Sequence, residues 1–406
     1  MNRSRPRSRE DQHIYYAEAA LSGQGQHLAN QAQHLVDSIP AEHGMAPPPP
    51  PFPGTGFNAE LFANSSEFAV DNTIHLDWEN IDRKSTGTSV IDISSVYDDS
   101  GRSFHGYKSG KYFFPNDPTE QDRLDLQHAG LLLLLNGKLG NAPVKDPKFV
   151  LDLATGTGIW AMEYAQQHPD AQVIGTDLSD IQPKFQLPNC SFMVDDAEDE
   201  WLFGSSDEPI KFDYIHLRFV FSCFDEPRKV VSQAFKNLQP GGWMEYLESS
   251  MEFHSIDNNI EGTALKQWAE LSYQGLAKKG RDARVAKNYA QWMRDEGFVD
   301  VHEEILICPG NHWPEDRRLK RCGRYMLANC YQGFRGNAWK LFKECGLASD
   351  EIETLVSDAK NDAANRKYRW FWPVYVVYGR RPFEWEVTTS STGSQTETMM
   401  SNIHYS

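Results

Sequence analysis

The stretch from Phe149 to Asp177 restricts the fold more than any other part of the chain. It begins with the apolar run Phe149–Leu153, which is too short for a helix and rich enough in branched residues to be a buried strand. A glycine turn follows, then a helical segment from Ile159 to Gln167, then a second apolar run that ends in Asp177. This order of strand, glycine loop, helix, strand and acid is typical of a nucleotide-binding βαβ unit.

The glycine loop itself could serve several ligands. A phosphate-binding P-loop is excluded, because Gly158 is followed by Ile159 and Trp160 where that loop needs Lys and Ser or Thr. A dinucleotide loop stays open, since Gly156, Gly158 and Ala161 satisfy the spacing G-x-G-x-x-A. The spacing alone therefore does not choose between nucleotide cofactors.

The acid Asp152, which lies inside the first strand and ahead of the turn, favours one of these cofactors. The run Val150–Gly158 resembles the glycine motif of class I S-adenosyl-L-methionine (SAM) methyltransferases. The resemblance implies SAM as the cofactor, with Asp152 positioning its amino-acid end and Thr155 completing the loop. Ala154 stands where that family usually has its first glycine, which predicts a slightly altered turn and intact binding.

Three further motifs follow in the order that this family has them. Ser191–Val194 is a third strand candidate, and Asp195, Asp196 and Ala197 after it resemble the Asp-Ala pair that contacts the adenine amino group. Phe212–Leu217 resembles the fourth strand, and Gln239–Glu245 resembles the L-x-P-G-G turn and fifth strand. We therefore predict an α/β fold, a doubly wound seven-stranded Rossmann-like methyltransferase sheet with an added helical cap and insert.

The acid at the end of the second strand has its own predicted role. A carboxylate at this position can accept from both ribose hydroxyls of a nucleotide at once. We therefore assign the ribose of SAM to Asp177, with Leu178 beside it.

Composition restricts the partners and the compartment. The net charge of −17 over 406 residues disfavours sequence-independent binding to nucleic acid, which depends on clustered Lys and Arg. The leucine run Leu131–Leu135 is far shorter than the roughly 20 apolar residues that span a bilayer, and no secretory signal is apparent. Six scattered cysteines indicate neither a disulfide framework nor a metal site. We expect a cytoplasmic protein, with the nucleus as the alternative.

Composition also suggests how the chain is divided. Residues 1–60 are predicted to be a disordered, proline-rich tail, whose proline run at 47–51 could bind a protein partner. Residues 61–147 form a cap segment, residues 148–382 the methyltransferase domain, and residues 383–406 a second disordered tail. Within the domain, residues 309–372 lie between the expected sixth and seventh strands and are predicted to be a helical substrate insert.

A closer resemblance covers roughly Gly101 to Pro382. The aromatic and charged segment from Gly101 to Asp125, with the later motifs Asn189–Phe192 and Trp243–Glu245, looks like the fungal LaeA-like methyltransferases. That group contains both a regulator of secondary metabolism and tailoring enzymes of biosynthetic clusters. The resemblance implies that the segment before the first strand caps the cofactor pocket. The residues that it assigns to the cap are Tyr107, Tyr112 and Arg123.

Candidates for catalysis and acceptor binding are less specific. A general base helps when the acceptor is a phenol or an alcohol. His216 near the end of the fourth strand is the first candidate and Glu248 the second, with His254 and His312 behind them. Inserts at the carboxyl ends of such strands often enclose the ligand site. The aromatic insert therefore gives the substrate candidates, which are Trp313, Tyr325 and Met326.

Three classes of function follow from the sequence. The first is methylation of a small-molecule secondary metabolite, with oxygen as the favoured acceptor atom. The second is a LaeA-like nuclear regulator that binds SAM and acts through protein partners. The third is a SAM-binding fold that catalyses a reaction other than methyl transfer.

Overall fold

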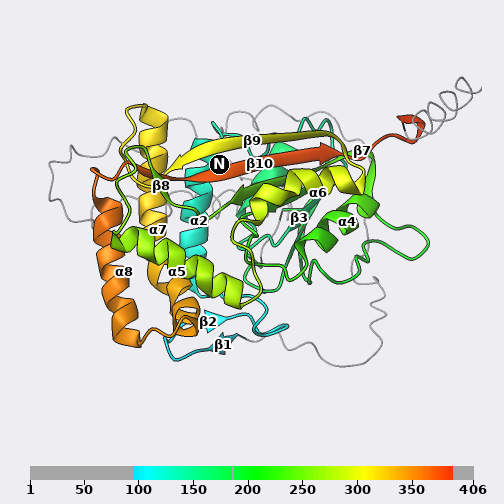
Figure 1. Cartoon of the computed structure of the whole chain (residues 1–406). Helices are drawn as coiled ribbons and strands as arrows, with labels where there is room; N and C mark the ends of the chain where they lie inside the picture. The colour runs from blue at the N-terminus through cyan, green and yellow to red at the C-terminus, as the bar shows by residue number, and fades with distance from the viewer. Residues whose placement is uncertain (1–94, 185–186, 387–406) are drawn as a thin grey trace, which may run out of the picture. The chain divides into compact units, whose positions relative to one another are not determined.

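The computed structural model describes residues 95–184 and 187–386 (Figure 1). The helices and strands named below lie between Val96 and Arg380. The tail predicted at 1–60, the first part of the cap segment and residues 387–406 lie outside the described residues.

From residue 149 onward the described chain contains both strands and helices, with several of each following one another directly. The strands are β1 (Val96–Tyr97), β2 (Ser103–Phe104), β3 (Phe149–Leu153), β4 (Gln172–Asp177), β5 (Cys190–Val194), β6 (Phe212–Arg218), β7 (Leu238–Ser249), β8 (His254–Ser255), β9 (Val299–Pro309) and β10 (Trp370–Arg380). The helices are α2 (Pro118–Leu134), α3 (Ile159–Gln167), α4 (Pro227–Asn237), α5 (Ala264–Lys278), the 3₁₀ turn η3 (Val285–Asn288), α6 (Tyr289–Glu296), α7 (Arg317–Glu344) and α8 (Ser349–Ala364).

The central sheet has the predicted doubly wound arrangement. Its order is β5-β4-β3-β6-β7-β10-β8, with β9 also paired to β10. The pairs from β5 to β7 are parallel, and β10 is antiparallel to each of its neighbours. The seven expected strands are confirmed, and the two-residue strand β8 is an addition. It forms because β10 extends past the end of β7, so that Trp370 and Phe371 pair with Ser255 and His254.

Most of the predicted elements occur close to their expected bounds. The helix predicted at Ile159–Gln167 has those bounds in the structure, and the insert between β9 and β10 folds into α7 and α8. Helix α2 lies in the segment predicted as a helical cap, and its start carries clear signals although its bounds were not predicted. Asp117 caps it by accepting the backbone N–H of Glu120, and Pro118 occupies the first turn. No helix of the described residues is long and apolar enough to cross a membrane.

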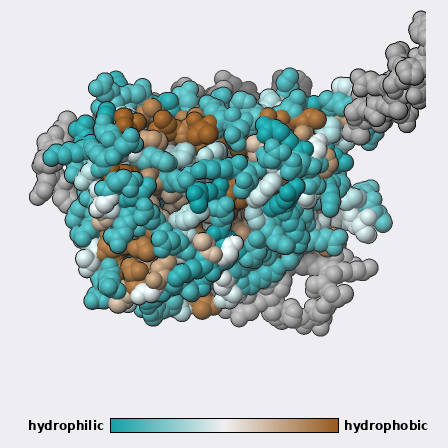
Figure 2. Space-filling model, in the orientation of Figure 1, coloured by the Kyte–Doolittle hydropathy of each residue, from teal (hydrophilic) through white to brown (hydrophobic). Residues whose placement is uncertain are grey.

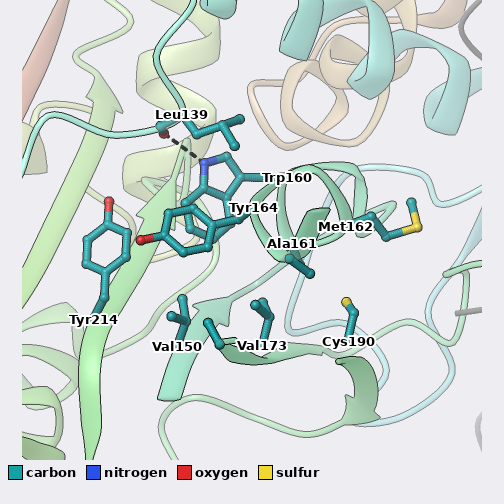
Figure 3. Close-up of a cluster of buried hydrophobic side chains, with 11 residues drawn as sticks. Leu139, Val150, Trp160, Ala161, Met162, Tyr164, Val173, Cys190 and Tyr214 are labelled. Atoms are coloured by element: carbon teal, nitrogen blue, oxygen red, sulfur yellow. Dashed lines mark hydrogen bonds between the residues drawn. The ribbon is translucent and has the colours of Figure 1, made fainter. Parts of the chain in front are cut away.

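Helix α3 is held on the sheet by a buried aromatic cluster (Figure 3). Trp160 and Tyr164 stack with ring centroids 4.8 Å apart, and Tyr214 of β6 lies beside both. The indole of Trp160 also donates to the carbonyl of Leu139 at 2.8 Å, which satisfies its buried N–H. This packing holds α3 in position on the sheet. It therefore also restricts the position of the glycine loop, which leads directly into α3.

Strand β9 lies at one edge of the sheet. Ile305 and Ile307 are about half exposed, at 52% and 50%, and Figure 2 shows apolar surface along the part of the molecule where Figure 1 draws this strand. The neighbouring Glu303 and Glu304 are also exposed. Charges on an edge strand oppose pairing with another chain.

The folded chain continues a few residues past β10. Arg380 forms ion pairs with Asp300 and Glu386, both at 2.8 Å or less, and the ring of Phe383 lies under the Arg380 guanidinium. Residues 383–386, which the sequence assigned to the tail, therefore contact the sheet.

Candidate active site

The carboxyl ends of β3 to β7 meet at one edge of the sheet and border a large cavity. Because these five strands are parallel, the residues that follow each of them meet at this edge, where ligands bind in open α/β sheets. One continuous lining joins these strand ends to α2, α5, α7 and β10. Of the predicted site residues, the following line the cavity: Tyr112, Arg123, Asp152, Ala154, Thr155, Gly156, Asp177, Leu178, Asp195, Asp196 and Ala197.

The loop after β3 has the tight conformation that the glycine motif requires. Ala154 takes a left-handed backbone angle, φ 53°, in the place of the usual glycine. The turn is therefore kept, at a cost of roughly 1 to 2 kcal/mol for a residue with a side chain. Gly158 does not line the cavity. Its φ is 78°, and a Cβ there would lie 2.4 Å from Cζ of Phe192, so both the backbone angle and the packing against β5 require this glycine.

Asp177 is fixed at the end of β4 by two backbone groups. Its Oδ2 accepts the N–H of Gly156, and its Oδ1 accepts the N–H of Ser179, both at 2.9 Å. Burial raises the pKa of this carboxyl to about 6, and the two N–H donors act against that rise. Each oxygen keeps a second lone pair for a ligand hydroxyl.

The two acids after β5 have different environments. Asp196 is buried and ion-paired with Lys108 and Lys111 of the segment before α2. Asp195 accepts the N–H of Asp196 at 2.9 Å, and burial raises its pKa to about 6. Asp195 is therefore better placed than Asp196 to accept a hydrogen bond from a ligand. The ion pairs of Asp196 join the segment before α2 to the end of β5.

The cap side of the cavity is formed by the residues around the start of α2. Tyr112 lines the cavity and packs edge-on against Phe114 with ring centroids 5.5 Å apart. Arg123 is buried, pairs with Glu120 at 2.7 Å and donates to Asn329 of α7 at 2.6 Å. Tyr107 lies outside the cavity lining, beside Lys108.

Part of the cavity lining is an aromatic wall formed by Phe253, Trp268, Phe334 and Trp372. These residues come from the segment after β7, from α5, from α7 and from β10. The ring centroids of Trp268 and Phe334 are 4.7 Å apart, and Phe253 lies about 6 Å from both Trp268 and Trp372. All four side chains are buried in the fold and line the cavity. The wall offers an apolar, rigid surface to a ligand.

His216 lies beneath the glycine loop and outside the cavity lining. Its Nδ1 is 2.7 Å from Oδ1 of Asp152, and its ring stacks on Trp160 at 3.7 Å. Thr155 donates to the other oxygen of Asp152 at 2.5 Å. The histidine is therefore placed to orient Asp152, and it is not at the surface that an acceptor would reach.

Glu248 is also away from the cavity lining. It is fully buried near the end of β7, and its oxygens accept the backbone N–H groups of Val220 and Ser249, each at 2.8 Å. Burial raises its pKa to about 8. Its surroundings include the stacked rings of Tyr246 and Tyr289, which lie 3.8 Å apart.

The raised pKa of Glu248 predicts how stability depends on pH. The folded protein keeps this proton up to about pH 8, whereas the unfolded chain releases it near its ordinary value of 4.5. Stability should therefore fall as pH rises, by about 2 kcal/mol between pH 6.5 and 8.5. Urea unfolding at the two pH values measures this fall. The Glu248→Gln variant should lose about 2 kcal/mol less than the wild type across this window, whatever its absolute stability. An unchanged slope in the variant would assign the proton to another group.

The predicted substrate residues of the insert do not line the cavity. Trp313 donates its indole N–H to the carbonyl of Trp370 at 2.8 Å. Tyr325 and Met326 pack against Gly130 of α2, where an added Cβ would lie 3.3 Å from Cβ of Tyr325 and 2.8 Å from Cε of Met326. These three side chains join the insert to the rest of the fold.

The insert reaches the cavity through a part of α7 that begins one turn after these residues. Asn329, Gly333 and Asn337 line it at a spacing of four residues, together with Cys330 and Phe334. Oδ1 of Asn337 is buried and has no hydrogen-bond partner among the described residues. The signal in the sequence is the repeat of small or amide residues at i, i+4 and i+8 in an otherwise aromatic segment, since such residues share one helix face.

Comparison with known proteins agrees with this architecture. The family model described as "Methyltransferase domain" matches residues 127–303. "Methyltransferase pytC" of Aspergillus terreus is 32% identical over 316 residues, which are 76% of this chain and 96% of that protein. The chain belongs to the methyltransferase family. "Probable methyltransferase tdiE" of Emericella nidulans is 34% identical over 71% of this chain and 90% of its own. "Protein-methionine methyltransferase laeA" of the same fungus is 30% identical over 71% of this chain and 77% of its own.

The cofactor of this methyltransferase is SAM, and the cavity residues fit it. The cofactor combines a base, a ribose and a zwitterionic amino acid. The lining offers acids after β5 and at the end of β4, and beside the glycine loop it offers the carboxylate of Asp152 and the guanidinium of Arg218. These groups are complementary in kind and in order to the three parts of the cofactor.

Proposed function

We propose that the protein methylates a small-molecule acceptor that binds against the aromatic wall. The observation that carries this proposal is the continuity of one cavity lining, from the acids and glycine loop at the strand ends to Phe253, Trp268, Phe334 and Trp372. A cofactor and an apolar acceptor would meet inside this cavity.

The roles of the cofactor-binding residues follow from their positions. SAM, when bound, supplies a methyl group already activated on a sulfonium, so the protein has mainly to align the acceptor and exclude water. Asp177 accepts the ribose hydroxyls, and Asp195 with Ala197 receives the adenine. Asp152, oriented by His216 and Thr155, accepts from the ammonium of the amino-acid end. Tyr112 and Arg123 close the cap side.

Oxygen is the acceptor atom that we propose. Asn337 lines the cavity, and its buried amide oxygen has no hydrogen-bond partner among the described residues. An acceptor that carries hydroxyl groups on an aromatic or otherwise apolar skeleton would satisfy this oxygen by donation and pack its skeleton on the wall. Such compounds are common among secondary metabolites, and several relatives of this chain are described as "Secondary metabolism regulator laeA".

A second candidate is a regulator that methylates a protein. The support is the similarity to proteins described as "Secondary metabolism regulator laeA", one of them from Aspergillus fumigatus with 30% identity over 73% of this chain and 80% of its own. In this case a segment of the protein substrate would bind against the aromatic wall, in the place that we assign to the small molecule.

One labelling experiment separates the two candidates. The full chain is incubated with SAM carrying a labelled methyl group and with a fungal extract, and the label is then followed separately in small molecules and in proteins. We expect it in a small molecule, and we expect none with the Asp177→Ala variant. Label confined to protein would support the regulator, and no label in either fraction would contradict methyl transfer by this cavity.

A further inference from the structure

The cavity contains a cation to which the proposed function assigns no ligand group. Arg218 ends β6 and lines the cavity, and the structure shows no ion pair for it among the described residues. The other lining arginine, Arg123, is already neutralised by Glu120 at 2.7 Å. Arg218 is therefore the lining cation with charge and hydrogen-bond donors available to a ligand.

Arg218 is held in place from behind by two helices. Its Nη1 is 2.7 Å from Nδ1 of His128 in α2, and Nε2 of His128 is 3.0 Å from Oε2 of Glu163 in α3. An arginine can only donate, so Nδ1 accepts and Nε2 carries the proton that it donates to Glu163. Burial lowers the pKa of His128, which is consistent with a neutral ring.

The position of Arg218 identifies the ligand group that it faces. In the register of β3 and β6, Asp152 pairs with His216 and Leu153 with Leu217, so Arg218 comes level with Ala154 in the glycine loop. Asp152 is close enough to Arg218 to act on its charge. The loop therefore has an anion and a cation side by side, which matches the ammonium and carboxylate of an α-amino acid.

We propose that Arg218 binds the carboxylate of the methionine part of SAM and that His128, supported by Glu163, is the residue that positions it. A guanidinium binds a carboxylate by charge-assisted hydrogen bonds, and an arginine fixed in advance loses less entropy in doing so. This assignment concerns the cofactor alone and does not depend on which acceptor is methylated.

Calorimetry with two ligands tests the proposal. S-adenosylhomocysteine carries the amino-acid chain, and 5′-methylthioadenosine has the same adenine and ribose without it. In Arg218→Gln, affinity for S-adenosylhomocysteine should fall at least about tenfold, whereas affinity for methylthioadenosine should change less than about twofold. His128→Phe should show the same ligand dependence with a smaller loss, of roughly threefold.

Other roles of Arg218 predict different changes in the affinities for the two ligands. Equal losses for both ligands would mean that Arg218 only supports the pocket, and unchanged affinity for S-adenosylhomocysteine would mean that its partner lies elsewhere. Either result overturns the proposal. If Arg218→Gln does not fold, the wild-type protein still decides, by comparison of S-adenosylhomocysteine with its decarboxylated analogue. Equal affinities of the wild type for those two ligands would also overturn it.

Discussion

Replacement of Asp177 by alanine should weaken the binding of SAM by about 3 kcal/mol, roughly a hundredfold. The loss has two parts. The ribose hydroxyls lose a charged acceptor, and the N–H groups of Gly156 and Ser179, which Asp177 now accepts at 2.9 Å, lose their partner beside the cavity. Calorimetry with S-adenosylhomocysteine measures the effect without the need for an acceptor.

The same segment offers a matched control. Asp180 is three residues further on, is exposed and forms a surface ion pair with Lys184 at 2.8 Å. Asp180→Ala removes the same charge and should leave affinity unchanged, since exposed ion pairs contribute little. Equal effects of the two variants would indicate that Asp177 acts through the net charge of the site, and an unchanged affinity in Asp177→Ala would remove it from the ribose site.

The cofactor side of the cavity could be predicted because its determinants are local in sequence. The glycine loop, the acid at the end of β4 and the acids after β5 each follow a recognisable strand, and parallel strands bring their carboxyl ends together. Even the substitution at Ala154 could be interpreted, because its position in the motif requires a left-handed angle and the structure shows one, φ 53°.

Individual side chains on this side were harder to assign. His216 and Glu248 follow the strands as catalytic residues often do, but the pleat directs successive side chains to opposite faces of a sheet. His216 faces Asp152 and Trp160, and Glu248 faces the backbone of residues 220 and 249. The order of residues along a strand can be read from the sequence. Which of these side chains a ligand can reach depends on how α3 and α6 pack against β6 and β7.

The acceptor side depends on contacts between distant segments. Trp268, Phe334 and Trp372 are far apart in the chain and meet only because α5 and α7 pack together beside the end of β10. The aromatic content of the insert predicted that it contributes to acceptor binding. It could not show which part of α7 lines the cavity. Trp313 precedes α7 and contacts β10, and Tyr325 lies one turn before Asn329, where it packs against α2.

Replacement of Phe334 by alanine should therefore lower kcat/KM for the acceptor by roughly a hundredfold, because about 2 to 3 kcal/mol of apolar contact is lost from the wall. The affinity for S-adenosylhomocysteine should stay within error. The variant should also lose about 3 to 5 kcal/mol of stability, as buried Phe→Ala changes do. Acceptor kinetics, ligand calorimetry and urea unfolding are measured together at a temperature where the variant is folded.

Phe342 provides the control for that loss of stability. It lies on the same helix, is fully buried and contacts the same Trp268 with ring centroids 6.0 Å apart, but it does not line the cavity. Phe342→Ala should lose comparable stability and keep its acceptor kinetics, since the wall facing the ligand is intact. If both variants lost kcat/KM equally, the effect of Phe334 would be a consequence of a loosened core. The acceptor would then have to bind on the cap side of the cavity, against Tyr112 and Phe114.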